Sequence, residues 1–422
     1  MLSCVAKWFK ILALFCFLTQ SAFAQKTSRY FDSLLKASLP RYAPVFASPK
    51  KYKLQIIYTR ITRDKNNKPS FQDFYWHADT MQFFYPASLV KLPVSITAIE
   101  KINRELKDKG IDRNTPMLTD SAFYCQKRVT HDSTAQNGLP SVAHYIKKMF
   151  LVSDNYSFAR TYEFVGCDYL HQNLERWGFQ NIRIVNRLDG QCRNDTGKIT
   201  SPVYFLSPTG EALYKQPLTF AQYNKPYPLA GAKVGKAHIN EFGRRVYTPK
   251  DFSRHNFMSL YDCHEIFKRL VFWNYMSEDK KYSMSAGDWE FMMKYLGMYP
   301  RESDYPKYNS RIFYDSFKKY FMHAAALPRI SGDTLRVFNI VGRAYGFLSD
   351  VAYIVDYKNK VEFLVSATIY VNEKNIVGSG KYQYDSIGLP LFRDMSQLIY
   401  KVEKKRKKKY EPNLEEFELF DK

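Results

Sequence analysis

The chain changes from strand-like to helix-like patterning at residues 85–101, YPASLVKLPVSITAIEK. The apolar side chains of this stretch recur with the spacing of one helix face, at Leu89, Leu92, Ile96 and Ile99. We therefore predict a helix that begins at about Ala87. Because proline lacks a backbone donor, we expect a kink in this helix at Pro93.

Ser88 and Lys91 form an S-x-x-K motif at the start of the predicted helix. Residues three apart lie on the same helix face, so the Lys91 amine can reach the Ser88 hydroxyl. A serine is a weak nucleophile until a neighbour takes its proton, and a lysine can do so when desolvation and nearby positive groups lower its pKa. The motif is short, and about one or two matches to it are expected by chance in a chain of this length. The alternative interpretation of Lys91 is a solvent-facing helix lysine.

Ser153-Asp154-Asn155 lies in a short break between two further helices. The first is expected over Val142–Phe150 after an N-cap at Ser141, and the second ends at Gly166. Ser153 can relay a proton to a leaving group, Asn155 can hydrogen-bond a substrate amide, and Asp154 braces the loop. A helix N-cap cluster is the alternative, since these residue types favour helix starts. The two motifs in this order favour the catalytic interpretation.

Strand patterns lie near both ends of the chain and helix patterns in between. The predicted strands are Lys53–Thr62, Phe71–His77, Val351–Val355 and Val361–Val371. Further helices are predicted over Asp168–Gly178, Leu260–Phe272, Ser285–Leu296 and Leu389–Val402. We therefore expect the terminal strands to pair in one antiparallel sheet, the middle helices to form a second lobe, and a cleft to open between them. Residues 200–250 show weak periodicity and are expected to be a surface insertion.

The two motifs and this order of elements resemble class A β-lactamases and the related penicillin-binding proteins, whose pattern is S-x-x-K, then S-D-N, then K-T-G. The resemblance covers roughly residues 53–400. It implies an α+β, β-lactamase-like (DD-peptidase/transpeptidase-like) fold, with an antiparallel sheet flanked by helices and an all-helical lobe. It also implies a serine hydrolase that acts through an acyl-serine intermediate on a β-lactam or a related amide or ester.

The third motif of the family is degenerate here, because Ile340-Val341-Gly342-Arg343 stands where K-T-G is expected. Gly342 still permits a substrate to approach the strand edge closely. The backbone N–H of Arg343 can join that of Ser88 in an oxyanion hole. The lysine and hydroxyl that hold a β-lactam carboxylate in the family are absent.

A second departure follows Arg187-Leu188-Asp189, near which family members that hydrolyse penicillins place the glutamate that activates the deacylating water. The run Gly190–Asp195 contains no glutamate, and Asp195 would substitute only if the loop shifted. Without such a base an acyl-enzyme can form and persist. The alternatives to a hydrolase are therefore a penicillin-binding or wall-peptide module that acylates with little turnover, and a non-catalytic envelope-binding protein.

Residues 1–24 have the features of a signal peptide. Lys7 and Lys10 precede the apolar run Ile11–Leu18, and Ala22-Phe23-Ala24 forms a small-x-small cleavage site. The run is too short to span a bilayer, so no transmembrane segment is expected after cleavage. We expect an exported, periplasmic or extracellular protein, with one hydrolase domain over residues 25–400 and a charged, solvated and frayed tail over 401–422.

The formal net charge of +22 restricts the class of partner. A nucleic acid is the usual partner of so basic a chain, but export argues against it. An anionic cell-envelope polymer fits the charge better, and a merely soluble basic surface is the alternative. Four cysteines remain in the mature part, Cys125, Cys167, Cys192 and Cys263, and the sequence does not choose their pairing. They are too widely spaced for a zinc motif, so we expect no metal and no cofactor.

Overall fold

The computed structural model describes residues 25–122, 126–189, 197–225, 229–323, 327, 329–330 and 334–420. The expected signal peptide, Cys125 and the run Gly190–Asp195 with Cys192 lie outside these residues. Cys167 and Cys263 are buried free thiols, so neither forms a disulfide.

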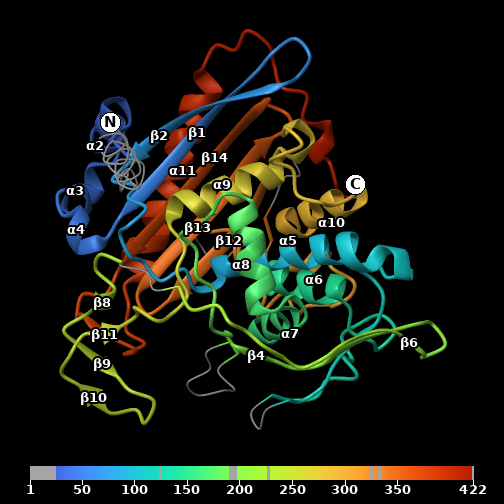
Figure 1. The fold of residues 1–422 in the computed structure, drawn as a ribbon. Helices are drawn as coiled ribbons and strands as arrows, with labels where there is room; N and C mark the ends of the chain where they lie inside the picture. The colour runs from blue at the N-terminus through green and yellow to red at the C-terminus, as the bar shows by residue number, and fades with distance from the viewer. Residues whose placement is uncertain are drawn as a thin grey trace, which may run out of the picture.

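A five-stranded antiparallel sheet runs through the centre of the molecule in the order β12-β13-β14-β1-β2 (Figure 1). Its strands are β1 (Gln55–Arg63), β2 (Pro69–Trp76), β12 (Leu335–Ala344), β13 (Phe347–Asp356) and β14 (Val361–Tyr370). The N-terminal and C-terminal strands of the sheet meet where β1 pairs with β14, with Gln55 opposite Thr368. The predicted sheet of terminal strands is confirmed, and the strand that carries Gly342 forms one of its edges.

The two faces of the sheet pack against different sets of helices, because successive side chains of a strand point to opposite sides. Ile56 and Val337 belong to one hydrophobic core and Ile57 and Phe338 to the other. The first core is covered by α2 (Arg29–Ser38), α3 (Ala43–Phe46), α4 (Pro49–Tyr52) and α11 (Leu389–Lys405). The second is covered by α5 (Lys91–Lys101), α6 (Val142–Val152), α7 (Asn155–Val165), α8 (Cys167–Arg176), α9 (Leu260–Val271) and α10 (Ala286–Gly297). None of the helices within the described residues is long and apolar enough to cross a membrane.

Helix α5 is buried on every side, although its sequence predicts a single apolar face. Every residue from Lys91 to Lys101 is buried. One turn of 3₁₀ helix, η2 (Ala87–Val90), precedes it. Pro93 therefore lies in the first turn of α5, where a backbone donor has no intrahelical partner to lose. The irregularity that we expected at Pro93 lies instead at Lys91, where the 3₁₀ turn gives way to the α-helix.

The stretch 200–250 is only partly a surface insertion. Strand β5 (Val203–Leu206) pairs with β3 (Met117–Thr119), and Phe205 is buried in the larger core. The remaining short strands are β4 (Ile199–Thr200), β6 (Ala212–Gln216), β7 (Thr219–Phe220), β8 (Lys233–Val234), β9 (Ala237–Ile239), β10 (Arg245–Val246) and β11 (Lys250–Asp251). Strands β8 to β11 lie at the lower edge of the molecule, beyond the end of the central sheet (Figure 1).

The end of the chain is folded, so the prediction of a solvated and frayed tail after residue 400 is wrong up to residue 420. Helix α11 continues to Lys405, and Leu414 and Phe417 are buried in the larger core. The Phe417 ring lies 4.9 Å from the ring of Tyr353 and 5.8 Å from that of Phe338, measured between centroids. Charged residues dominate the sequence of this segment, but the apolar side chains between them pack against the sheet.

Candidate active site

The Lys91 amine lies at the centre of the predicted site. The side chain is fully buried, and Nζ lies 2.8 Å from Ser88 Oγ, 2.5 Å from the Ser153 carbonyl oxygen, 3.0 Å from Ser153 Oγ and 2.7 Å from Asn155 Oδ1. The structure thus brings together Ser88, Lys91, Ser153 and Asn155, four of the five residues that the two sequence motifs single out.

The chemistry of these neighbours orients the amine. The Ser153 carbonyl and Asn155 Oδ1 only accept hydrogen bonds, so they take N–H groups from Lys91. A neutral amine has two N–H groups and one lone pair. With both N–H groups used, the lone pair is left for a hydroxyl that can donate, and Ser88 Oγ is at the shorter distance. This arrangement suits a base that takes the proton of Ser88.

Burial holds the pKa of Lys91 well below its usual value, because the charged form loses its water. The positive charge of Lys318 lowers the pKa further, and the negative charge of Asp154 opposes the shift. A neutral amine is therefore favoured at a pH where an exposed lysine would be protonated.

Unusual backbone angles place the two serines. Ala87, directly before Ser88, has φ of 47°, and Ser153 has φ of 62° at the C-cap of α6. Such left-handed conformations are strained for residues other than glycine and gather at functional sites. The Asp154 side chain caps α7 by accepting the Ser157 N–H at 2.7 Å, so for this residue the N-cap alternative holds.

The residues of the site differ in exposure. Lys91 is fully buried, Ser88 and Ser153 are partly exposed, and Asn155 is exposed. The Asn155 amide nitrogen is the group of that side chain that would donate to a substrate.

Strand β12 forms the other wall of the site, and there Gly342 has a packing role. A Cβ atom at Gly342 would lie 2.3 Å from the carbonyl oxygen of Pro86, two residues before Ser88. The turn that carries Ser88 thus packs closely against Gly342, and the substrate-binding role of Gly342 stays a prediction. The Arg343 side chain is exposed, with its guanidinium carbon 5.6 Å from the centroid of the Tyr384 ring. The oxyanion role of its backbone N–H stays a prediction.

The acidic groups around Arg187 are engaged in ion pairs. Glu163 is fully buried, and its carboxylate accepts from Arg187 Nε at 2.9 Å and from the Ser201 N–H at 2.5 Å. A carboxylate of Asp189 lies 3.9 Å from a guanidinium nitrogen of Arg160. The predicted absence of a deacylating glutamate concerns Gly190–Asp195, which lie outside the described residues.

Lys318 is a residue near the site that the sequence analysis missed. It lies in the long connection between α10 and β12, is buried, and donates from Nζ to the carbonyls of Met149 at 3.1 Å and Phe150 at 2.8 Å. Lysines are mostly exposed, so a lysine pair attracts no attention in a sequence. The signal that was present is its setting, Tyr314-Asp315-Ser316-Phe317-Lys318-Lys319-Tyr320-Phe321, where aromatic residues surround the pair.

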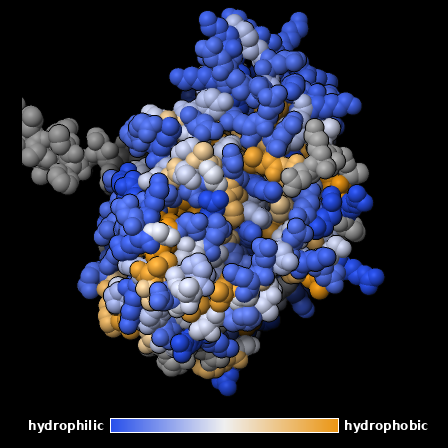
Figure 2. All heavy atoms as spheres, turned by 90° about the vertical axis from the view of Figure 1, so that its right-hand side faces the viewer, coloured by the Kyte–Doolittle hydropathy of each residue, from blue (hydrophilic) through white to orange (hydrophobic). Residues whose placement is uncertain are grey.

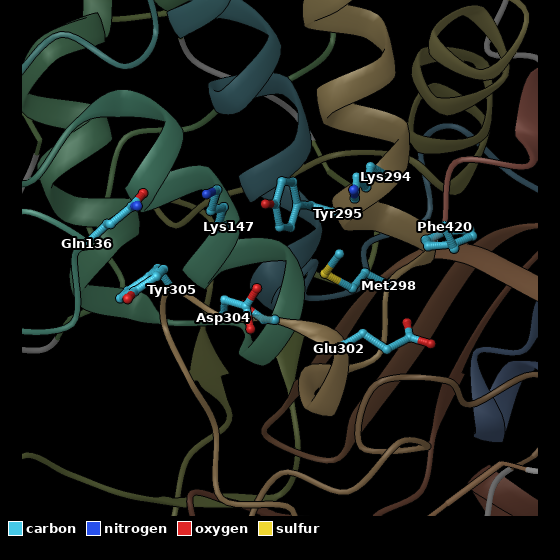
Figure 3. A pocket seen from close by; sticks show the side chains of 10 residues that line it. Gln136, Lys147, Lys294, Tyr295, Met298, Glu302, Asp304, Tyr305 and Phe420 are labelled. Atoms are coloured by element: carbon cyan, nitrogen blue, oxygen red, sulfur yellow. The ribbon is translucent and has the colours of Figure 1, made fainter. Parts of the chain in front are cut away.

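A separate cavity of about 370 Å³ opens beside α6 and α10 (Figure 3). Lys147 of α6 faces Tyr295 of α10, with Nζ 5.1 Å from the ring centroid, and Asp304 and Tyr305 lie on the side opposite these helices. Its lining does not include Ser88, Lys91, Ser153 or Asn155.

Comparison with known proteins points to one family. Residues 53–211 match the Beta-lactamase2 model, which describes the β-lactamase enzyme family. Similar solved structures include a β-lactamase from Xanthomonas campestris pv. campestris str. ATCC 33913, 11% identical over 88% of this chain and 98% of that chain (TM-score 0.46). A β-lactamase from Streptomyces albus G is 10% identical over 87% and 99% (TM-score 0.46), and PBP-A is 11% identical over 90% and 98% (TM-score 0.46). No curated protein matches the sequence. The predicted resemblance is confirmed over the matched residues, which include both motifs.

Proposed function

We propose that this chain is an exported serine hydrolase that acts through an acyl-serine intermediate on a β-lactam or a related amide or ester. The observation that carries the proposal is the buried Lys91 amine, which lies 2.8 Å from Ser88 Oγ, 2.5 Å from the Ser153 carbonyl oxygen and 2.7 Å from Asn155 Oδ1. A non-catalytic binding protein has no need of a desolvated amine at a partly exposed hydroxyl.

The proposed acylation uses side chains from both motifs. Lys91 takes the proton of Ser88 as Oγ attacks the substrate carbonyl, and the backbone N–H groups of Ser88 and Arg343 stabilise the oxyanion. As the C–N or C–O bond breaks, the proton passes from Lys91 through the Ser153 hydroxyl, 3.0 Å away, to the leaving group. Asn155 holds the substrate amide from the exposed side.

A second candidate is a penicillin-binding or wall-peptide module that acylates and turns over slowly. The observation that favours it is the engagement of the nearby acids, since Glu163 is bound by Arg187 and Asp189 lies beside Arg160. Both carboxylate oxygens of Glu163 already accept hydrogen bonds, one from Arg187 and one from the Ser201 N–H.

Intact-mass spectrometry over time tests the proposal. The mature protein is incubated with a labelled penicillin and, separately, with a generic activated ester. A transient adduct that is absent in Ser88→Ala supports the hydrolase, and a persistent one supports the second candidate. No adduct with either probe overturns both and leaves a binding protein.

The proposal of export rests on the sequence of residues 1–24, with a basic start, a short apolar run and a small-x-small cleavage site. Expression of the full-length precursor in a bacterium should yield an exported protein whose N-terminal residue is Gln25. A product that keeps residues 1–24 and stays inside the cell would contradict this.

An anionic cell-envelope polymer is the proposed partner of the basic end of α11. Figure 2 shows that the upper end of the molecule, where α11 and the β1–β2 turn end, is covered by hydrophilic side chains. Exposed lysines gather there, at Lys401, Lys404, Lys405, Lys407 and Lys409. Retention on an anionic polymer should weaken as salt rises and weaken further when these lysines are changed to glutamine.

A further inference from the structure

Two adjacent lysines are buried between the sheet and the helical lobe. Lys318 and Lys319 are each 4% exposed. The Lys319 amine donates to the carbonyls of Leu296 and Val337 and to Asn339 Oδ1, at 2.7, 2.7 and 2.9 Å. The Lys318 amine points elsewhere, to the carbonyls of Met149 and Phe150. The two neighbours thus bind different elements of the fold.

The contacts of Lys318 lead directly to the catalytic bend. Met149 and Phe150 lie in the last turn of α6, whose free carbonyls carry the negative end of the helix dipole. The Met149 carbonyl also accepts the N–H of Ser153, the residue that ends the helix. Ser153 in turn presents its carbonyl and hydroxyl to Lys91. One helix end therefore separates the Lys318 amine from the partners of Lys91.

We propose that Lys318 is a positioning residue for the Ser88–Lys91 pair, because it fixes the last turn of α6 and with it the Ser153 carbonyl and hydroxyl that contact Lys91. The proposal rests on the proposed function, because it assigns a role in the activation of Ser88.

The charges that face each amine set the sign of the effect. Lys318 and Asp154 are the charged groups that act on Lys91, while Asp350 and Lys319 accompany Lys318. Burial lowers the pKa of Lys318 to about 7. Below that pH Lys318 is protonated and opposes the protonation of Lys91, so its removal raises the pKa of Lys91. In a plot of acylation rate against pH, the acid limb reports the protonation of Lys91. This limb should then move to higher pH.

The test measures the acylation rate with labelled penicillin from pH 5 to 9 in Lys318→Met, Lys318→Arg and Lys319→Met. For Lys318→Met we expect the acid limb to move up by about one pH unit, which lowers the rate on that limb about tenfold. The guanidinium of Lys318→Arg keeps the charge and should return the limb toward the wild-type position. Lys319→Met is the matched control, equally buried but bound to other elements, and should not move the limb.

A measurement without catalysis separates this proposal from the proposed function. The Cε resonance of Lys91, labelled with ¹³C and assigned with Lys91→Met, should show in the wild-type protein an inflection near pH 7 that is absent in Lys318→Met, even if Ser88 forms no adduct. The absence of this inflection overturns the proposal, as does an acid limb that Lys319→Met moves as far as Lys318→Met. A failure of the wild-type protein to acylate, with the inflection present, overturns the hydrolase and leaves the electrostatic coupling standing.

Discussion

The wall formed by α5 and the α6–α7 bend differs from the wall formed by β12 in what it offers to Ser88. On the first wall, side chains converge on the hydroxyl, and Lys91 alone meets four oxygen atoms. On the second, Gly342 packs against the Pro86 carbonyl and the Arg343 side chain lies at the surface beside Tyr384. The first wall therefore supplies proton transfer, and the second supplies shape and backbone donors. Changes on the first should act on the rate of chemistry, and changes on the second on stability.

The largest effect should come from Lys91→Met, which removes the base of the first wall. We expect the acylation rate to fall about 100- to 10,000-fold, the usual contribution of general-base catalysis. Tm should stay the same or rise, since a buried amine resists desolvation and methionine does not. Lys101→Met is the matched control, because Lys101 is also buried in α5 but bonds to the Phe164 carbonyl and to Gln216. Equal loss of rate in both variants would contradict the assignment.

Phe417→Ala should have the next largest effect, on stability. Phe417 is fully buried and packs behind the second wall, against Phe338 of β12 and Tyr353 of β13. Truncation of a buried phenylalanine costs about 3–5 kcal/mol in the free energy of unfolding, which denaturant titration measures. Phe220→Ala, at a side chain 64% exposed, serves as control and should cost less than about 0.5 kcal/mol. A small loss in the free energy of unfolding of Phe417→Ala would instead support the prediction that the segment after residue 400 is frayed.

Gly342→Ala should destabilise the contact between the two walls. The added Cβ would lie 2.3 Å from the backbone of Pro86, which cannot move without shifting the turn that carries Ser88. Overpacking of this kind costs about 1–3 kcal/mol, and the acylation rate should fall as well. Gly287→Ala in α10 is the control, since its nearest neighbour would lie 3.9 Å away, and it should be neutral or slightly stabilising. If Gly342→Ala were as stable as the wild-type protein, β12 would not pack tightly against the turn at Pro86.

Arg343→Ala should have the smallest effect, because the variant keeps the backbone N–H that we assign to the oxyanion. The side chain is exposed and contacts the Tyr384 ring, so the free energy of unfolding should change by less than about 0.5 kcal/mol. Acylation by the neutral activated ester should be nearly unchanged. A large loss with penicillin but not with the ester would show that the guanidinium binds the carboxylate of the substrate, and the second wall would then supply a side chain after all.

Local patterns in the sequence predict most of the fold. The strand pattern of residues 53–62 lies in β1, and the helix expected after Ser141 is α6, capped by that serine. Two of the errors, at α5 and at the end of the chain, share a cause. Ser95 and Glu100 are polar but buried, and Phe417 stands among charges but fills a core. In each case a distant segment covers the residue, and a periodicity that extends over a few positions contains no record of that segment.

The sequence alone determined which groups are available: a serine and a lysine one helical turn apart, a Ser-Asp-Asn bend, and a strand without the lysine of the third motif. The tertiary structure decided their chemistry. The pKa of Lys91 is low because α6, α7 and the connection before β12 exclude water from it and bring Lys318 near. Spacing along the chain fixes which side chains share a face, but desolvation depends on everything that packs around them, and the fold alone assembles those surroundings.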